Sequence, residues 1–357
     1  MYTRNETKVI NVGGVLIGGG NPIAVQSMAN ADSRNAAVVI EQVHRLAECG
    51  CEILRIAIPD NEAADVFRGI KKASPIPLIA DIHFDYRLSV AAIKNGADMV
   101  RINPGNIGGA DRVREVVSAA KSAGIPIRVG VNGGSLEKEL YKKYGGITPQ
   151  ALCESVLNHI NILEANSFYD IELSVKASDI PLTLETHKLI CAQVNYPVHI
   201  GITEAGTVYS GTIKSAVGIG ALLAMGVGDT VRVSLTADPS EEIKAAKEIL
   251  KSFGLRQFGV NLISCPTCGR CDVDLFKMAH EVEDFCKTIN TPMTVAVMGC
   301  EVNGPGEAAH ADFGIACGKN SGVIFKKGKI VDKLPADQLA SALITKIAAF
   351  CPETNIS

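Results

Sequence analysis

Residues 77–103 read PLIADIHFDYRLSVAAIKNGADMVRIN and contain one complete strand–helix–strand unit. The runs Pro77–His83 and Asp98–Asn103 are mostly apolar, which is typical of parallel strands that are buried on both faces. Between them, Tyr86–Asn95 has the apolar spacing of a helix, and Gly96 follows as a helix-terminating residue. The segment therefore predicts two parallel strands joined by a helix.

The same unit recurs along the first 236 residues. Strands are expected at Ile23–Met28, Glu52–Ile58, Pro77–His83, Asp98–Asn103, Pro126–Asn132, Asp170–Lys176, Pro197–Thr203 and Thr230–Thr236. Helices are expected at Asn35–Cys49, Asn61–Lys72, Tyr86–Asn95, Ala110–Ala123, Pro149–Glu164, Leu182–Val194, Thr212–Met225 and Ser240–Phe253. Eight such units predict an α/β fold, a (β/α)8 TIM barrel. A doubly wound sheet is the alternative, but the sequence lacks the nucleotide fingerprint of that fold.

The composition excludes several classes of protein. The chain has 357 residues, and 35 Lys and Arg against 38 Asp and Glu give a net charge of −3, so no nucleic-acid partner is expected. Its 11 cysteines are sparse and odd in number, which favours a reduced, cytoplasmic protein. Met1–Gly20 has no apolar core of signal-peptide length, and no run is long enough for a membrane span.

Two segments outside the repeats carry separate expectations. The glycines between Gly13 and Gly20 lack the Gly-Lys-Ser/Thr ending of a phosphate loop, so we expect a hairpin or plug at the bottom of the barrel. Residues 133–146 are expected to form a charged loop above the barrel mouth. This loop could be a lid, an interface or a solvated connection.

Polar residues gather at the carboxyl ends of the predicted strands. They are Arg55, Asp81, His83, Arg101, Asn103, Arg128, Asn132, Lys176, Thr203, Glu204, Arg232 and Ser234. In a barrel these ends converge on the face where active sites are built. Four arginines and a lysine exceed the acidic residues there, and Arg donors match phosphate oxygens. The pattern predicts a phosphorylated ligand, and a carboxylate substrate is the alternative.

The pattern changes after Phe253, so the expected domains are 1–254 and 255–357. The second domain is expected to be α+β. Its strands are expected at Val260–Ile263, Met293–Met298, Asp312–Ala316, Ser321–Phe325 and Lys329–Val331, and its helices at Val273 to about Lys287 and at Pro335–Phe350.

Cysteines in this second domain have the spacing of metal ligands. Cys265, Cys268 and Cys271 form a C-x2-C-x2-C run after one strand, and Cys300 follows the next strand. Thiolates on loops bind zinc or iron–sulfur clusters. Glu307 lies seven residues after Cys300. Three thiolates with a weaker oxygen ligand would leave one exchangeable position on a cluster.

These motifs together resemble a known family. They are VQSM (25–28), ADIHFD (80–85), RINPGNIG (101–108), RVGVNGGSL (128–136), IELSVKASD (171–179), HIGITEAG (199–206), VRVSLT (231–236), LISCPTCGR (262–270) and GCEVNGPGE (299–307). In this order they resemble the bacterial two-domain 4-hydroxy-3-methylbut-2-enyl diphosphate synthases of the methylerythritol phosphate route to isoprenoids.

The resemblance implies an iron–sulfur oxidoreductase. It would reductively open 2-C-methyl-D-erythritol 2,4-cyclodiphosphate and remove a hydroxyl in two one-electron steps, with flavodoxin or ferredoxin as the donor. The second domain would resemble half of a sulfite or nitrite reductase, and homodimers would place it over the partner's barrel.

The resemblance also implies roles for single residues. The [4Fe–4S] cluster ligands would be Cys265, Cys268, Cys300 and Glu307. The substrate-binding residues would be Arg55, Arg101, Asn103, Arg128, Asn132, Lys176, Arg232 and Ser234. The catalytic residues would be Asp81, His83, Thr203, Glu204, Asn303 and Glu307.

Three alternatives stay open. Cys271 stands where the family usually has a hydroxyl residue, so it could be a fourth thiolate in place of Glu307. The chain could instead be a non-redox barrel enzyme that acts on a phosphorylated substrate and has a structural zinc in its tail. A third possibility is an electron carrier with a closed four-cysteine cluster.

Overall fold

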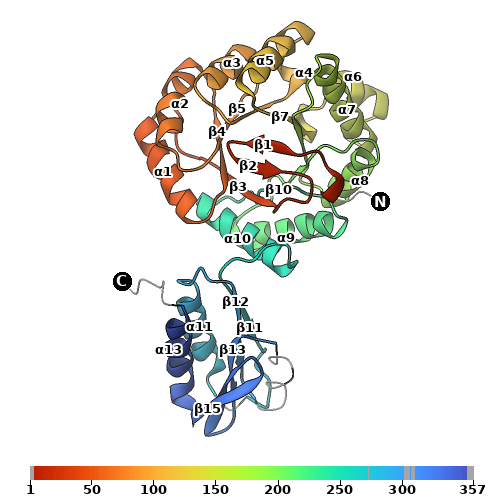
Figure 1. The fold of residues 1–357 in the computed structure, drawn as a ribbon. Coiled ribbons are helices and arrows are strands. Elements are labelled where there is room, and N and C mark those ends of the chain that lie inside the picture. The colour runs from red at the N-terminus through yellow and green to blue at the C-terminus, as the bar shows by residue number, and fades with distance from the viewer. Residues whose placement is uncertain (1–3, 272, 301–305, 307–309, 352–357) are drawn as a thin grey trace. The chain divides into compact units, whose positions relative to one another are not determined.

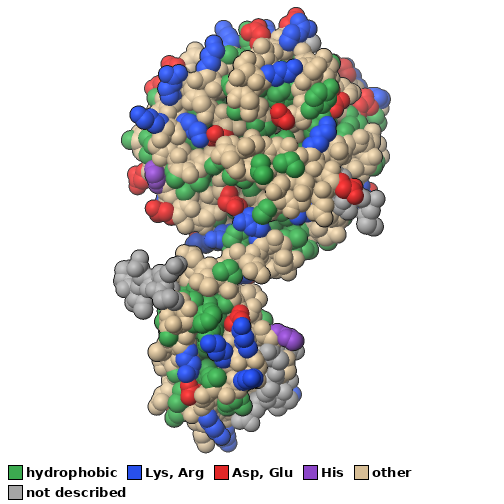
Figure 2. Space-filling model, viewed as in Figure 1, with side chains coloured by type: hydrophobic (Ala, Val, Ile, Leu, Met, Phe, Trp, Pro, Cys, Tyr) green, Lys and Arg blue, Asp and Glu red, His purple; other side chains and the backbone are tan. Residues whose placement is uncertain are grey.

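The computed structural model describes residues 4–271, 273–300, 306 and 310–351. The chain folds as two compact units, Met1–Arg256 and Gln257–Ser357. No helix in the described ranges is long and apolar enough to cross a membrane. Figure 2 shows side chains of both charge signs interspersed over the visible face of the first unit.

The first unit contains an eight-stranded parallel sheet in the order β8-β7-β6-β5-β4-β3-β10-β9. The strands are β3 (Ala24–Met28), β4 (Ile53–Ala57), β5 (Leu78–Asp81), β6 (Met99–Ile102), β7 (Ile127–Asn132), β8 (Ile171–Lys176), β9 (His199–Ile200) and β10 (Thr230–Val231). A parallel bridge between Leu173 and Val198 joins the two ends of this order and closes the barrel. The predicted TIM barrel is therefore confirmed.

A helix follows each barrel strand and contributes to an outer ring (Figure 1). These helices are α1 (Ala36–Glu48), α2 (Asn61–Ala73), α3 (Tyr86–Lys94), α5 (Ala110–Ala123), α7 (Pro149–Ala165), α8 (Ile180–Cys191), α9 (Val208–Ala224) and α10 (Pro239–Ser252). Short side chains fix several of their starts. Asp60 accepts a hydrogen bond from the Ala63 amide at 3.0 Å, and Asp179 accepts one from the Leu182 amide at 2.7 Å.

The glycine-rich amino-terminal segment forms the antiparallel hairpin β1 (Ile10–Val12) and β2 (Val15–Ile17). Gly13 and Gly14 make the turn with φ of +57° and +100°, a region that favours glycine. The hairpin packs its buried apolar side chains on the starts of barrel strands, in a cluster of Ile10, Val12, Ile17, Ala24, Ile53, Ile79 and Met99. Figure 1 shows the hairpin across one barrel opening, so the expected plug is confirmed.

Residues 133–146 are not the extended charged loop that the sequence suggested. They form a 3₁₀ turn at Gly133–Ser135 and the helix α6 (Lys138–Tyr144). Leu140 is buried, and Lys143 pairs with Glu154 of α7 at 2.6 Å. A buried leucine and polar contacts from Glu137, Lys143 and Tyr144 to α7 hold this segment against the outer ring.

The second unit is a five-stranded sheet in the order β11-β12-β13-β14-β15. The strands are β11 (Val260–Ser264), β12 (Met293–Met298), β13 (Phe313–Cys317), β14 (Ser321–Lys326) and β15 (Lys329–Pro335). The first three are parallel and the last two antiparallel. The helices α11 (Leu275–Cys286) and α13 (Leu339–Phe350) share one core with the sheet and lie on one of its faces (Figure 1).

The parallel strands of this unit decide where its cysteine loops lie. β11 and β12 are paired along their whole length, with Ser264 opposite Val297. Their carboxyl ends therefore lie at the same edge of the sheet, and the segments that begin at Cys265 and Gly299 both leave from that edge.

Candidate active site

The side chains at the carboxyl end of the barrel converge because strand register brings them together. Asp81 of β5 is opposite Arg101 of β6, and Arg101 is opposite Arg128 of β7. Farther along β7, Asn132 is opposite Lys176 of β8. Successive residues of a strand alternate between faces, so every second residue points to the same side of the sheet.

Asp81 is the acidic centre of one half of the mouth. Its carboxylate accepts a hydrogen bond from Arg101 Nη1 at 3.2 Å and lies 3.6 Å from Arg55 Nε and 3.4 Å from His83 Nε2. Its side chain is only 2% exposed. Burial alone would raise the pKa of Asp81, but Arg55, His83 and Arg101 outweigh it and hold that pKa below its ordinary value. Four expected site residues thus meet in one cluster.

Arg101 lies flat against β7 at a position that only glycine permits. Its guanidinium is buried and donates from Nη2 to the Gly130 carbonyl at 3.4 Å. A Cβ at Gly130 would lie 2.1 Å from Arg101 Nε, which no real side-chain contact allows. Gly130 therefore makes the space in which Arg101 turns toward Asp81.

Arg128 lies deeper than the sequence suggested. Its Nε is 2.6 Å from Glu172 Oε2, and its Nη2 donates to Gln26 Oε1 at 2.7 Å. The side chain is fully buried, and burial, partly offset by Glu172, lowers the pKa of Arg128. Its remaining nitrogen, Nη1, has no hydrogen-bond partner among the residues that the structure describes.

Lys176 ends β8 and is almost completely buried. Its Nζ lies 3.0 Å from Nε2 of His199 on β9. Burial, followed by the positive charges of Arg232, Arg55 and Arg128, lowers the pKa of Lys176 well below the ordinary lysine value.

Arg232 follows β10 and completes the ring of cations. Its Nε lies 3.6 Å from Oε2 of Glu242 on α10, and that same oxygen accepts a hydrogen bond from Ser27. Burial and the charge of Arg55 lower the pKa of Arg232 to about 10, with Glu242 opposing.

The mouth carries more positive side chains than its carboxylates balance. Five cations (Arg55, Arg101, Arg128, Lys176 and Arg232) face three carboxylates (Asp81, Glu172 and Glu242). Buried nitrogens of three arginines, Arg55 Nε, Arg128 Nη1 and Arg232 Nε, lack a hydrogen bond within the described part of the chain. Unpaired buried donors are costly, and an anion with several oxygens would satisfy them.

Neutral donors lie beside these cations. Asn103, buried after β6, donates from Nδ2 to the Ser135 hydroxyl at 3.1 Å. Ser135 also accepts from the Asn132 amide at 3.3 Å and donates to the Asn132 carbonyl at 3.1 Å. One serine that the sequence analysis missed therefore holds two expected site residues together.

Glu204 has an unusual backbone conformation in the loop after β9. Its φ is +54°, in the left-handed region that favours glycine. The side chain is exposed, while Thr203 and Ser234 are half-buried. A non-glycine residue held in this region stores strain, which is frequent at functional sites.

The cysteine loops of the second unit approach one another at the sheet edge. The Gly299 amide donates to Cys265 Sγ at 3.2 Å. A Cβ at Gly299 would lie 2.7 Å from Cys271 Sγ. Both sulfurs therefore lie beside the residue that precedes Cys300, while Cys268 is exposed.

These thiols do not form a metal-binding site in the described part of the structure. In the described ranges no three His, Cys, Asp or Glu side chains are close enough to hold a metal ion. Asn303 and Glu307 lie outside the described residues. The donor set is nevertheless chemically suited to an iron–sulfur cluster, since cluster thiolates come from loops of this kind.

Comparison with known proteins follows the same division of the chain. The GcpE TIM-barrel domain matches residues 7–247, and the GcpE protein C-terminal domain matches residues 261–349. The chain belongs to the GcpE family. Its two matched domains correspond to the barrel and to the five-stranded unit that carries the cysteine loops.

Curated GcpE-family relatives match nearly the whole chain. A protein of Caldanaerobacter subterraneus subsp. tengcongensis is 55% identical over 98% of this chain and 99% of its own length. A protein of Ruminiclostridium cellulolyticum is 54% identical over 97% and 98%, and one of Geobacter sulfurreducens 53% over 98% and 99%. All three are named 4-hydroxy-3-methylbut-2-en-1-yl diphosphate synthase (flavodoxin).

Two solved structures resemble about 70% of the chain. Dihydropteroate synthase from Stenotrophomonas maltophilia is 14% identical with a TM-score of 0.50, covering 70% of this chain and 98% of its own. N-acetylneuraminic acid synthetase from Leptospira borgpetersenii serovar Hardjo-bovis is 12% identical with a TM-score of 0.50, covering 70% and 90%. At this identity the likeness supports the barrel fold of the GcpE-family chain and nothing about its chemistry.

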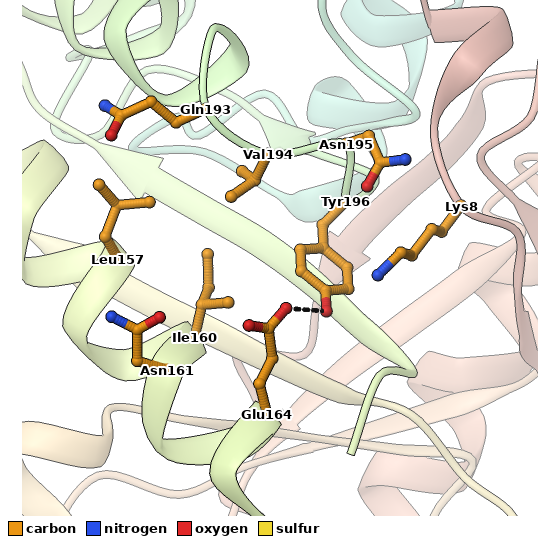
Figure 3. A pocket seen from close by; sticks show the side chains of 9 residues that line it. All are labelled: Lys8, Leu157, Ile160, Asn161, Glu164, Gln193, Val194, Asn195 and Tyr196. Atoms are coloured by element: carbon orange, nitrogen blue, oxygen red, sulfur yellow. Dashed lines mark hydrogen bonds between the residues drawn. The ribbon is translucent and has the colours of Figure 1, made fainter. Parts of the chain in front are cut away.

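A cavity of about 380 Å³ lies at the other end of this GcpE-family barrel (Figure 3). The Tyr196 hydroxyl donates to Glu164 at 2.7 Å, and Lys8 Nζ lies 4.0 Å from the centre of the Tyr196 ring. Tyr196 precedes β9 and Glu164 is near the end of α7, so this cavity faces the amino ends of the strands. That end of a TIM barrel contributes to stability, while chemistry occurs at the opposite end.

Several polar residues of the first unit were not identified from the sequence. They are Gln26, Glu172, His199, Thr230 and Glu242, all buried. For two of these residues, the alternation of side-chain direction along a strand could have indicated that they point into the barrel. Gln26 precedes Met28 by two positions and Glu172 precedes Lys176 by four, so each points to the same side of its strand as the later residue.

Proposed function

We propose that the chain is a 4-hydroxy-3-methylbut-2-en-1-yl diphosphate synthase. It converts 2-C-methyl-D-erythritol 2,4-cyclodiphosphate to 4-hydroxy-3-methylbut-2-enyl diphosphate. Two electrons and one proton enter, a ring carbon–oxygen bond to phosphate breaks, and one hydroxyl leaves as water. The observation that carries this proposal is the barrel mouth, where five cations, three buried and two half-buried, exceed three carboxylates. Buried nitrogens of three arginines lack a hydrogen-bond partner within the described residues.

The diphosphate binds to the cations of the mouth. Arg55, Arg128 and Arg232 each offer a buried nitrogen that makes no hydrogen bond to another described residue. Arg101 and Lys176 add positive charge, and Asn103, Asn132 and Ser234 supply neutral donors. Charge-assisted hydrogen bonds from buried arginines to phosphate oxygens are strong because water does not compete for them.

Proton transfer at the departing hydroxyl falls to side chains near the rim. Asp81 holds Arg55, Arg101 and His83, and its lowered pKa keeps it ionised at neutral pH. It therefore positions its neighbours and does not donate a proton. Half-exposed His83 and exposed Glu204 are the groups that can move one, with Thr203 beside Glu204.

Cys265, Cys268, Cys300 and Glu307 would hold a [4Fe–4S] cluster on the second unit, and Asn303 would act in catalysis there. When it is bound, this cluster supplies the one-electron transfers of the reaction. The position of Cys265 Sγ, 3.2 Å from the Gly299 amide, supports the pairing of the two loops. The Sγ of Cys271 lies against the same glycine, which makes Cys271 the competing fourth ligand.

The protein acts as a homodimer with flavodoxin or ferredoxin as its electron donor, and the cluster unit of one subunit covers the barrel of the other. An apolar stripe on α9 supports a subunit contact. Tyr209, Ile213 and Val217 recur every fourth residue and are 81%, 48% and 56% exposed.

The test is anaerobic turnover of the cyclic diphosphate with an artificial one-electron donor. We expect a brown protein with iron and acid-labile sulfide in about equal amounts, and product that depends on the donor. A colourless protein that contains zinc and does not reduce the substrate would instead support a non-redox barrel enzyme. A brown protein whose absorption spectrum does not change when the cyclic diphosphate is added would support an electron carrier.

A further inference from the structure

A chain of four buried residues crosses the barrel interior from β8 to β10. Lys176 Nζ lies 3.0 Å from His199 Nε2, and His199 Nδ1 lies 2.8 Å from the Thr230 hydroxyl. That hydroxyl donates to Glu172 Oε1 at 2.6 Å. All four side chains are buried, so water does not compete for these contacts. None of them except Lys176 has a role in the proposed function.

The number of hydrogens on each group determines which residue donates in each of these hydrogen bonds. Glu172 accepts at both of its oxygens, from Arg128 Nε at Oε2 and from the Thr230 hydroxyl at Oε1, each at 2.6 Å. Thr230 has one hydroxyl hydrogen and gives it to Glu172, so its oxygen must accept from His199 Nδ1–H. The Nε2 of His199 then carries the lone pair and accepts a hydrogen from Lys176. Burial, followed by the charge of Lys176, lowers the pKa of His199, which agrees with a neutral ring.

The surroundings of Lys176 disfavour its positive charge until an anion binds beside it. No described carboxylate lies within 4.0 Å of its Nζ. The charged groups that act on it are Arg55 of β4, Arg128 of β7, Arg232 after β10 and Glu242 of α10. Gly201 leaves room for the ammonium, because a Cβ there would lie 3.0 Å from Lys176 Nζ and 2.3 Å from the Arg232 carbonyl.

We propose that Glu172, Thr230 and His199 are positioning residues that fix Lys176 for the substrate. Glu172 and Thr230 hold the His199 ring with its Nδ1 protonated, and Nε2 binds one hydrogen of the Lys176 ammonium. The other two hydrogens remain for phosphate oxygens. This inference rests on the proposed function, since it takes the anion to be the diphosphate of the cyclic substrate.

The test compares Thr230→Val, which has a similar shape without a hydroxyl, with Thr230→Ser, which keeps it. In Thr230→Val, the Nδ1–H of His199 has no hydroxyl to donate to. The tautomer with the hydrogen on Nε2 therefore becomes more populated, and Nε2 can no longer accept a hydrogen bond from Lys176. We expect KM for the cyclic diphosphate to rise about ten-fold, the loss of roughly one hydrogen bond to a charged group, with kcat changed less. The alkaline limb of kcat/KM should move to lower pH, and Thr230→Ser should restore both.

Two readouts do not depend on turnover. Nitrogen-15 NMR of histidine-labelled protein should show His199 with its hydrogen on Nδ1 in wild type and in Thr230→Ser, but not in Thr230→Val. Calorimetry should show weaker binding of the cyclic diphosphate to Thr230→Val. Thr183→Val is the control, because the buried Thr183 hydroxyl donates only to the Asp179 carbonyl, within α8's first turn.

An unchanged His199 tautomer, KM and pH profile in Thr230→Val would overturn the inference. If that variant does not fold, His199→Gln and His199→Leu give the same decision. Gln can offer Lys176 an amide oxygen, so His199→Gln should retain most of the affinity for the cyclic diphosphate. Equal losses of affinity in both variants would show that His199 has only a structural role. A wild-type protein that shows the Nδ1–H tautomer but does not bind the cyclic diphosphate would defeat the proposed function instead.

Discussion

Asp81 Oδ1 lies 3.2 Å from Arg101 Nη1, and the two residues are directly opposite each other on the parallel strands β5 and β6. Arg55 approaches the same carboxylate from β4. One buried carboxylate therefore holds two arginines of the barrel mouth in place.

Replacing Asp81 by Asn should disturb both arginines. The amide keeps the shape but removes the negative charge, so two buried cations lose their counter-charge. We expect a loss of about 3 kcal/mol in the free energy of unfolding at neutral pH and a lower kcat/KM. Urea unfolding and steady-state kinetics measure the two effects. An unfolding free energy equal to that of wild type would contradict the role of Asp81 as their anchor.

Gly130→Ala should displace Arg101. The new methyl group would lie 2.1 Å from Arg101 Nε, so the guanidinium must move away from Asp81. We expect an unfolding free energy lower by about 1–3 kcal/mol and a raised KM for the cyclic diphosphate. Gly134→Ala is the matched control, because a Cβ there meets no atom within 4 Å. Equal KM values for the two variants would show that Arg101 does not need this space.

Glu204→Gly should separate stability from activity. Glycine adopts a φ of +54° without strain, so the unfolding free energy should rise by about 1 kcal/mol. Turnover should fall, because the carboxyl group proposed to transfer a proton is lost. Glu204→Gln keeps the strained backbone and should lose turnover with unchanged stability. Full turnover in both variants would remove Glu204 from the site.

Asp229 should make stability depend on pH. Burial raises its pKa from 3.8 to about 6, although the Val198 amide donates to its Oδ2 at 2.9 Å. Its Oδ1 accepts from the Thr7 hydroxyl at 3.2 Å, and the same hydroxyl can donate to the Arg4 carbonyl at 2.9 Å. A protonated Asp229 can donate in the first contact, which leaves the Thr7 hydrogen for the Arg4 carbonyl.

The raised pKa of Asp229 means that the free energy of unfolding falls as the pH rises. Below pH 3.8 the carboxyl is protonated in both states, and stability is lost as the pH rises to about 6. The free energy of unfolding of Asp229→Asn should therefore exceed that of wild type by up to about 3 kcal/mol at pH 7.5 and by little at pH 4. Urea unfolding at several pH values measures this difference, and Asp111→Asn on an exposed side chain of α5 controls for lost charge. A gain that does not vary with pH would contradict the assignment.

Two variants should decide the fourth cluster ligand. If Glu307 is the ligand, Glu307→Ala should leave iron content mostly intact and lower turnover, since three thiolates still hold the cluster. Cys271→Ser should then retain iron, while Cys300→Ser should lose it. Loss of iron in Cys271→Ser together with unchanged turnover in Glu307→Ala would instead make Cys271 the ligand. Iron and sulfide analysis of anaerobically purified protein gives the answer.

Local sequence was enough to predict the barrel. Short apolar runs, capping residues such as Asp60 and Asp179, and the closing glycines act within a few neighbouring residues, so they can be read in order along the chain. The charged segment 133–146 was predicted wrongly as a loop. Its helix α6 depends on Leu140 and on a partner in α7, and no local pattern shows that partner.

The sequence by itself determined which side chains reach the carboxyl ends of the strands, because alternation along each strand is a local property. Only the tertiary structure decided how deep each one lies and which group it meets. Arg128 and Glu172 are 44 residues apart, and Lys176 and His199 are 23 apart, yet each pair is in contact. Register between neighbouring strands and closure of the barrel make these contacts, and both depend on packing across the whole sheet.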